Sequence, residues 1–297
     1  MRDVFYREDG VAGAVGAIFA MLIFVMVLSI YVTSYVPAQM TIYEQEYSAR
    51  LSDSLENLAS TVLTLIAEDR NGSSLMTTFD LVSDNVPFFT SPTYGLLNFS
   101  SYSQNEGSIS LSVNYNGEAS PYTLSAGGAA SAISNNRYFT DEMFSFEFTS
   151  VFFNRVMTSN TSFLSAGFIS PNSTNFINEP WINLTVVNID YVPSEISSSS
   201  TVPIMVTFLY ENSKVFSFKN KNEVQTITVT YSTSLYGKSF YQSVSSSLNN
   251  SGFLNFIART NQQSSFGFII ENPDYQLNTQ YVFNSVITEA YIEISFV

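Results

Sequence analysis

The chain has 297 residues, 11 Lys and Arg against 25 Asp and Glu, a formal net charge of −14 at pH 7, and neither cysteine nor histidine. These counts exclude disulfides and thiolate metal sites, and they remove the commonest metal ligand and the commonest general base at neutral pH. They also disfavour a nucleic-acid partner, which needs a basic face, whereas an aromatic content of 15% indicates a folded chain rather than a disordered acidic one.

The first predicted element is a helix without a charged side chain over residues 11–36. A helix of that length reaches roughly 39 Å, which exceeds the ~30 Å hydrocarbon core of a bilayer. Cleaved secretory signals have shorter apolar regions, so we expect this segment to insert into a membrane. Arg2 and Arg7 precede it and the next basic residue is Arg50, which predicts a cytoplasmic N-terminus and an outer C-terminal part.

Small residues recur through the first half of this segment, at positions four apart such as 10/14, 13/17 and 12/16/20. Such spacing allows helix backbones to approach closely inside a membrane. It therefore predicts a helix that packs against other helices, and the alternative is a flexible, alanine-rich anchor. The predicted packing residues are Gly13, Ala14, Gly16, Ala17 and Ala20.

A short charged leader that ends in Gly10, followed by VAGAVGAIFAMLIFVMVLSIYV, resembles the class III signal peptide and N-terminal helix of archaeal type IV pilin-like proteins. In that family a prepilin peptidase cleaves after the glycine, and the helix is retained, first as a membrane anchor and then as the packed core of a filament. The resemblance implies a cytoplasmic leader of residues 1–10 and cleavage between Gly10 and Val11. It implies three partners: membrane lipid, the peptidase, and copies of this chain or related pilins. Glu8 and Asp9 stand where the family usually has basic residues.

A second helical pattern covers residues 37–70 and predicts an amphipathic stalk. Its apolar residues recur at spacings of 4, 3, 4 and 3, at Leu51, Leu55, Leu58, Val62 and Leu65. Its polar positions include Glu44, Glu46, Asp53 and Glu56. Pro37 is expected to kink the junction, which gives one long bent helix from Val11 to about Arg70, stopped by Asn71-Gly72. The stripe is expected to pack on the β domain of its own chain or, alternatively, on the helix of a neighbouring subunit.

From residue 71 to 297 the pattern changes to strict alternation, which predicts a β-rich domain. Apolar side chains alternate with polar ones at Ile109, Leu111, Val113 and Tyr115, at Phe144, Phe146 and Phe148, and at Ile292, Ile294 and Phe296. Such strands have one buried face, as in a sandwich. The predicted fold class is α+β, a long N-terminal helix followed by a mainly antiparallel β-sandwich. The β-rich region is expected to form either one lobe or two lobes divided near residue 178.

Candidate modification and contact sites lie in the part predicted to be outside. Possible N-glycosylation sequons begin at Asn71, Asn98, Asn160, Asn172, Asn183 and Asn249. Asn71, Asn98, Asn172 and Asn249 are expected in or beside turns, and Asn183 inside a strand. The pairs Phe88-Phe89 and Phe152-Phe153 are expected in the core or between subunits, with an adhesive surface as the alternative.

Together these patterns predict a structural subunit or minor component of an archaeal type IV pilus-like surface filament. It would assemble through its N-terminal helix and display a β-rich domain outside. The expected location is the cell membrane and the extracellular surface. No enzyme activity, cofactor, metal or nucleic acid is expected. The alternative is a permanently anchored single-span envelope protein or adhesin.

Overall fold

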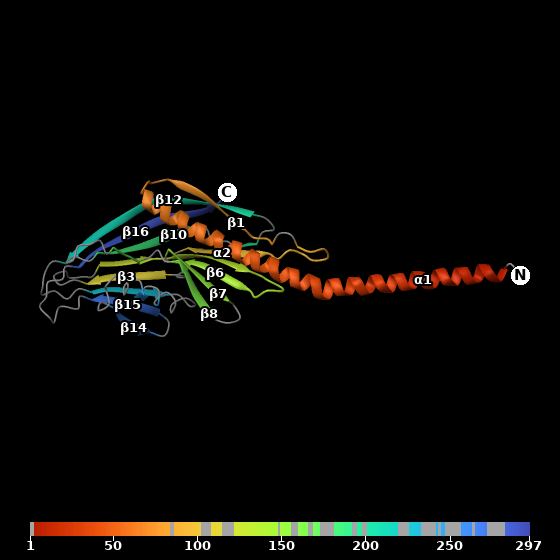
Figure 1. The fold of residues 1–297 in the computed structure, drawn as a ribbon. Helices are drawn as coiled ribbons and strands as arrows, with labels where there is room; N and C mark the ends of the chain where they lie inside the picture. Colours follow the sequence, from red (N-terminus) through yellow and green to blue (C-terminus); the bar gives the residue numbers. More distant parts are fainter. Residues whose placement is uncertain are drawn as a thin grey trace.

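In the computed structural model the protein is a long helix that projects from a β-rich domain (Figure 1). A rod of helix enters one end of the domain and continues along it, and the N-terminus lies at the far end of the projecting part. The structure describes residues 3–83, 86–101, 108–114, 122–147, 149–155, 160–165, 169–172, 181–191, 195–197, 201–218, 226–232, 242, 245–246, 257–262, 265–271 and 283–297.

The helical rod consists of α1 (Asp3–Ile30), a π-helical turn η1 (Tyr31–Tyr35) and α2 (Val36–Glu68). It bends where α1 gives way to α2 (Figure 1). Pro37 has no backbone N–H, and its ring crowds the preceding turn. That turn is widened, because the N–H of Val36 donates to the carbonyl of Tyr31, five residues back. The expected kink near Pro37 therefore takes the form of a π turn immediately before the proline.

The rod ends slightly earlier than the sequence predicts. Asp69 adopts the left-handed conformation, at φ 45°, and its N–H donates to the carbonyl of Ile66 at 3.2 Å. Aspartate is among the few residues other than glycine that adopt this conformation. Gly72, expected to stop the helix, instead lies in the following turn at φ 78° and donates its N–H to the carbonyl of Phe208 at 2.9 Å.

The described strands after the helix form three sheets. The first has the order β1 (Ser74–Asp80), β12 (Thr201–Phe218), β16 (Phe283–Phe296), β10 (Trp181–Tyr191), β9 (Ile169–Asn172). The second has the order β11 (Glu195–Ser197), β2 (Gly95–Ser101), β5 (Gly128–Ser134), β6 (Glu142–Glu147), β7 (Ser150–Arg155), β8 (Asn160–Ser165). The third has the order β14 (Ile257–Gln262), β15 (Ser265–Glu271), β13 (Thr226–Ser232), β3 (Ser108–Asn114), β4 (Tyr122–Ala126). The α+β class with mostly antiparallel sheets is confirmed, and the pair β10–β16 is parallel.

Each sheet combines strands from both sides of residue 178. β1 pairs with β12 in the first sheet, β2 with β11 in the second, and β3 with β13 in the third. The described strands are therefore not separated into two sequential groups at that residue.

Helix α2 shares a single core with the first and second sheets. It lies between β1 and β12 on one side and β6 and β7 on the other (Figure 1). The stripe residues Leu51, Leu55, Leu58, Val62 and Leu65 are all fully buried there. The side chains around them include Phe79, Val206 and Phe208 from the first sheet and Leu97, Phe99 and Phe146 from the second. The stripe thus packs on the domain of its own chain, and truncation of one such leucine to alanine costs about 2–5 kcal/mol.

The three sheets meet at Gly127, which joins β4 to β5, and at Gly128, the first residue of β5. The N–H of Ile189 in β10 donates to the carbonyl of Gly127 at 3.0 Å. Gly128 has φ 112°, and a Cβ there would lie 2.7 Å from the Cβ of Ile189. Only glycine fits this crossing, because it adopts positive φ freely and leaves room for the adjoining strand.

A second tight contact joins α2 to β2. Tyr47 is fully buried, its hydroxyl has no hydrogen-bond partner among the described residues, and burial raises the pKa of the phenol. A Cβ on Gly95 would overlap the Tyr47 hydroxyl oxygen and lie 3.3 Å from the carbonyl oxygen of Ile133. The absence of a side chain at Gly95 therefore makes the space for the Tyr47 ring.

Substitution at these two positions should be strongly non-additive. Gly95→Ala should lower the free energy of unfolding by about 1–3 kcal/mol through overpacking. Tyr47→Phe should raise it, because it removes a buried hydroxyl without a partner. The double variant should recover most of the loss, because the overlapping oxygen is gone. Chemical unfolding of the full chain in detergent, followed by circular dichroism, measures all three, and additive effects would contradict the contact.

Candidate membrane and assembly helix

The apolar surface of α1 is uncovered by the rest of the described chain. Its exposed large side chains are Val15, Ile18, Phe19, Met21, Leu22, Ile23, Phe24, Val25, Met26, Val27 and Ile30, followed by Val32 and Tyr35 in η1. Among the described residues, the rod from Ala12 is the one helix long and apolar enough to cross a membrane.

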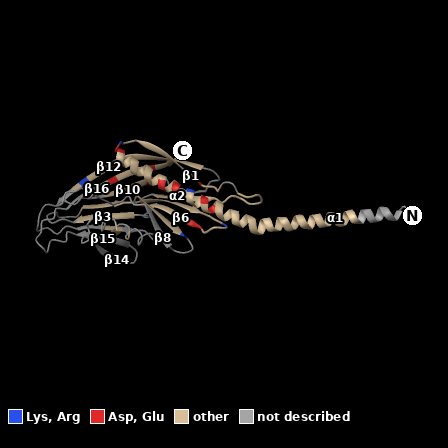
Figure 2. Ribbon diagram, viewed as in Figure 1, with Lys and Arg blue, Asp and Glu red and all other residues tan. Residues whose placement is uncertain are grey.

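This apolar surface surrounds the helix rather than forming one stripe. Seven consecutive positions, Met21 to Val27, carry large exposed apolar side chains, and consecutive positions point in different directions around a helix. Charged residues are marked along α2 and not on the tan part of α1 (Figure 2). After Asp9, the first charged residue in the chain is Glu44. A helix that is apolar all round is buried in lipid or among other helices.

The small residues predicted to mediate packing lie on this uncovered helix. Gly13, Gly16, Ala17 and Ala20 share one face, because positions three, four and seven apart are aligned. A Cβ added at Gly13 or Gly16 would meet no other atom within 4 Å, so the face is open. Ala14 lies at the edge of this face. The predicted cleavage point between Gly10 and Val11 lies within α1, where the helix is continuous.

Glu44 fixes the place where the rod enters the domain. Its carboxylate is fully buried and accepts four hydrogen bonds, from the Thr93 hydroxyl and from three successive backbone N–H groups. The Thr93 bond measures 2.7 Å, and those from Arg137, Tyr138 and Phe139 measure 2.9, 2.7 and 2.7 Å. A buried carboxylate is tolerated where its oxygens are this well satisfied. One side chain thus binds two loops of the domain to the first turns of α2.

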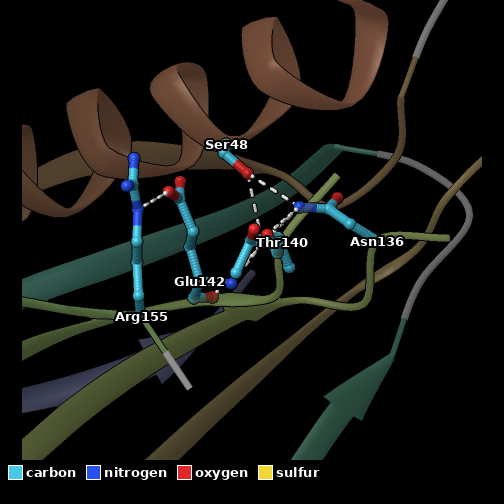
Figure 3. A network of polar contacts seen from close by, with 6 residues as sticks. Ser48, Asn136, Thr140, Glu142 and Arg155 are labelled. Carbon is cyan, nitrogen blue, oxygen red and sulfur yellow. Dashed lines mark hydrogen bonds and ion pairs between the residues drawn. The ribbon is translucent and has the colours of Figure 1, made fainter. Parts of the chain in front are cut away.

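A second polar network lies one turn further along α2 (Figure 3). The Ser48 hydroxyl donates to the Ser134 hydroxyl at 3.1 Å and accepts from the Asn136 amide at 3.2 Å. The same amide donates to the Thr140 carbonyl at 2.8 Å. The backbone N–H of Glu142 donates to the Ser134 hydroxyl at 3.1 Å. These bonds attach the turn between β5 and β6 to the helix.

The acidic residue at the start of β6 has a separate partner. The guanidinium of Arg155 donates from Nε to Oε1 of Glu142 at 3.1 Å, and the carboxylate is almost buried whereas the arginine is half-exposed. This pair joins neighbouring strands β6 and β7 beside the network of Figure 3. Glu142 therefore serves a cross-strand contact.

Glu44 was expected among the polar positions of the stalk, outside the apolar stripe, but its side chain is fully buried. Glu46, Asp53 and Glu56 are exposed as expected. Glu44 and Ser48 instead extend the buried stripe backwards, because 44, 48, 51, 55, 58, 62 and 65 keep the same 4 and 3 spacing. That continuing spacing was the signal that could have identified both residues.

The asparagines of the possible N-glycosylation sequons lie in different secondary structures. Asn71 is exposed in the turn after α2. Asn98 was expected in or beside a turn, but it lies half-buried within β2, because β11 and β5 pair with it on either side. Asn160 begins β8, Asn172 ends β9, and Asn183 lies inside β10; Asn249 lies outside the described residues.

No protein-family model matches the chain, and a comparison with curated proteins finds no match. Within the described ranges, no group of three or more acidic side chains is placed to hold a metal ion. The features of the described chain that indicate a function are α1 and its junction with the domain.

The Glu44 junction makes a direct prediction about stability. Glu44→Gln replaces one acceptor oxygen with an amide group that must face N–H donors, so it should lower the free energy of unfolding by about 2–4 kcal/mol. Glu46→Gln makes the same charge change at an exposed position two residues on and should change it by less than ~0.5 kcal/mol. Unfolding of both full-length variants in detergent measures the difference, and equal effects would contradict the role of the buried carboxylate.

Proposed function

We propose that this chain is a structural subunit or minor component of an archaeal type IV pilus-like surface filament. The observation that supports this most directly is a helix that is apolar on every face and projects from the domain without cover. At ~25 cal/mol per Å², burial of roughly 1,500 Å² of such a helix gains on the order of tens of kcal/mol relative to water. The helix therefore resides in lipid before assembly and among the helices of other subunits afterwards.

Two features of the sequence support retention and bundling of this helix. The apolar segment begins immediately after Gly10, as in the pilin-like proteins that the N-terminus resembles, which implies removal of residues 1–10 by a prepilin peptidase. Gly13, Gly16, Ala17 and Ala20 give one face on which a neighbouring helix can approach closely. The role is assembly rather than chemistry, and its partners are membrane lipid, the peptidase, and copies of this chain or related pilins.

The proposed topology places the short N-terminus in the cytoplasm and the β-rich domain outside the cell, because Arg2 and Arg7 precede the span. The sequons then all lie on the outer side, where N-glycans are attached. Asn71 is the best placed of those whose side chains are described, because it is exposed at a turn.

Replacement of Gly10 distinguishes a filament subunit from a permanently anchored envelope protein or adhesin. With Gly10→Val we expect the chain to keep its leader, because the bulkier residue blocks cleavage, and surface filaments to be lost. Ala12→Val adds a similar side chain beyond the cleavage point and should still be processed. N-terminal sequencing of membrane and sheared fractions measures both. A native protein that begins at Met1 and is displayed without filaments would favour the permanent anchor.

If the helices bundle through the small-residue face, a large side chain should impair filament assembly on that face but not on the opposite one. Gly16→Leu should leave membrane insertion intact, because the helix stays apolar, but it should prevent close helix approach and greatly reduce filament yield. Ser29→Leu also adds a large side chain on the same rod, on the opposite face, and should assemble like the native chain. Sedimentation of sheared filaments measures the yield. Normal assembly of Gly16→Leu would refute the role of this face.

A further inference from the structure

Two phenylalanines are exposed on the loop between β1 and β2. Phe88 is 78% exposed and Phe89 is 72% exposed, and their rings meet edge to face at 5.1 Å. They were expected in the core or between subunits, and the structure shows that they are not in the core. Their segment, Val86 to Tyr94, contains no charged residue. The one charged residue of the loop, Asp84, precedes this segment in the sequence. A segment without charge that presents two adjacent aromatic rings is an apolar contact surface.

This loop lies at the end of the domain nearest α1. Its base is closed by the bridge between Val82 and Tyr94, and Thr93 is bound to Glu44 on α2. In Figure 1 the loop extends past the strands toward α1 and reaches the level of the bend between α1 and α2. The loop that carries the phenylalanine pair therefore extends along the rod as far as the bend.

The turn between β5 and β6 adds polar and aromatic side chains at this end. The Arg137 guanidinium is exposed and donates to the Ser91 hydroxyl at 2.6 Å, and Tyr138 is also exposed. On the rod, Tyr31 and Tyr35 stack at 5.2 Å. Aromatic rings and arginine are the side chains that favour the boundary between acyl chains and headgroups. The end of the domain that surrounds the rod thus carries the side chains of a membrane interface.

The positions at which the rod becomes buried limit the distance between this end of the domain and the bilayer. The exposed apolar surface continues to Tyr35, whereas Val36 and Met40 are already buried in the domain. A helix rises only ~8 Å between positions 35 and 40. The domain therefore begins within about one turn of the end of the apolar span, which places it close to the membrane surface when α1 spans the bilayer.

We propose that the loop carrying Phe88 and Phe89, together with Arg137 and Tyr138, docks on the outer surface of the lipid bilayer. The two phenylalanine rings enter the headgroup–acyl boundary, and the Arg137 guanidinium faces the lipid phosphates. The unassembled subunit is then held upright by its span and by this second contact. This inference rests on the membrane-spanning role proposed above.

The cysteine-free chain allows a site-specific test in the full-length protein. Single variants Phe88→Cys, Met21→Cys and Asn71→Cys each carry one environment-sensitive fluorophore, and all three positions are exposed, so the fold is not disturbed. Each labelled chain is inserted as one copy per nanodisc, without nitroxide lipids or with lipids bearing a nitroxide either near the headgroup end or at the terminal end of the acyl chain. We expect the headgroup-end nitroxide to quench the label at 88, the terminal nitroxide to quench the label at 21, and neither to change the label at 71.

Other outcomes separate this inference from the proposed function. Quenching at 21 without quenching at 88 would overturn the docking and leave the membrane-spanning role intact. Absence of quenching at 21 would overturn both. A label at 88 that is unquenched in single-copy discs but becomes shielded when several copies share one disc would replace the bilayer with a second copy as the partner of this loop.

Discussion

The structure depends on the burial of one side of α2 between two sheets. The leucine stripe is fully enclosed, and Glu44 and Ser48 continue it with polar contacts to the loops at the entrance of the domain. Because the rod is continuous through η1, this burial also sets the direction in which α1 leaves the domain. The rod therefore lies in two different environments. Before Pro37 it is apolar on all sides, and after Pro37 it has an apolar stripe on one side only.

Local periodicity explains what could be predicted from the sequence. The 4 and 3 spacing from Leu51 to Leu65 and the alternation around Ile109 and Phe144 depend only on neighbours along the chain, so the helix and these strands were identified. The burial of Glu44 was not predicted, because glutamate usually lies at solvent-exposed positions. The N–H groups that satisfy it come from a turn more than ninety residues away, which no local pattern reveals.

The pairing of the strands could not be predicted from the sequence for the same reason. β3 pairs with β13 and β2 with β11 across more than ninety residues, and β10 pairs with β16 in parallel. Asn98 was expected in or beside a turn, and its place within β2 depends on pairing with β11 and β5, which no local pattern reveals. In the candidate site, the apolar span and its small residues were evident from the sequence. The position of the loop that carries Phe88 at the α1 end of the domain required the fold, because it depends on where Thr93 and Arg137 are held.

The anchorage of α2 also determines how the protein carries mechanical load. A pull along α1 is transmitted through η1 to a helix that is bound along its length to β1 and β12, and β12 and β16 extend along the same elongated domain (Figure 1). Tension then acts as shear on many side-chain contacts and strand hydrogen bonds at once, rather than peeling them apart in succession. With the rod embedded in this way, a tensile force has to disrupt the whole core before the domain can separate from its helix.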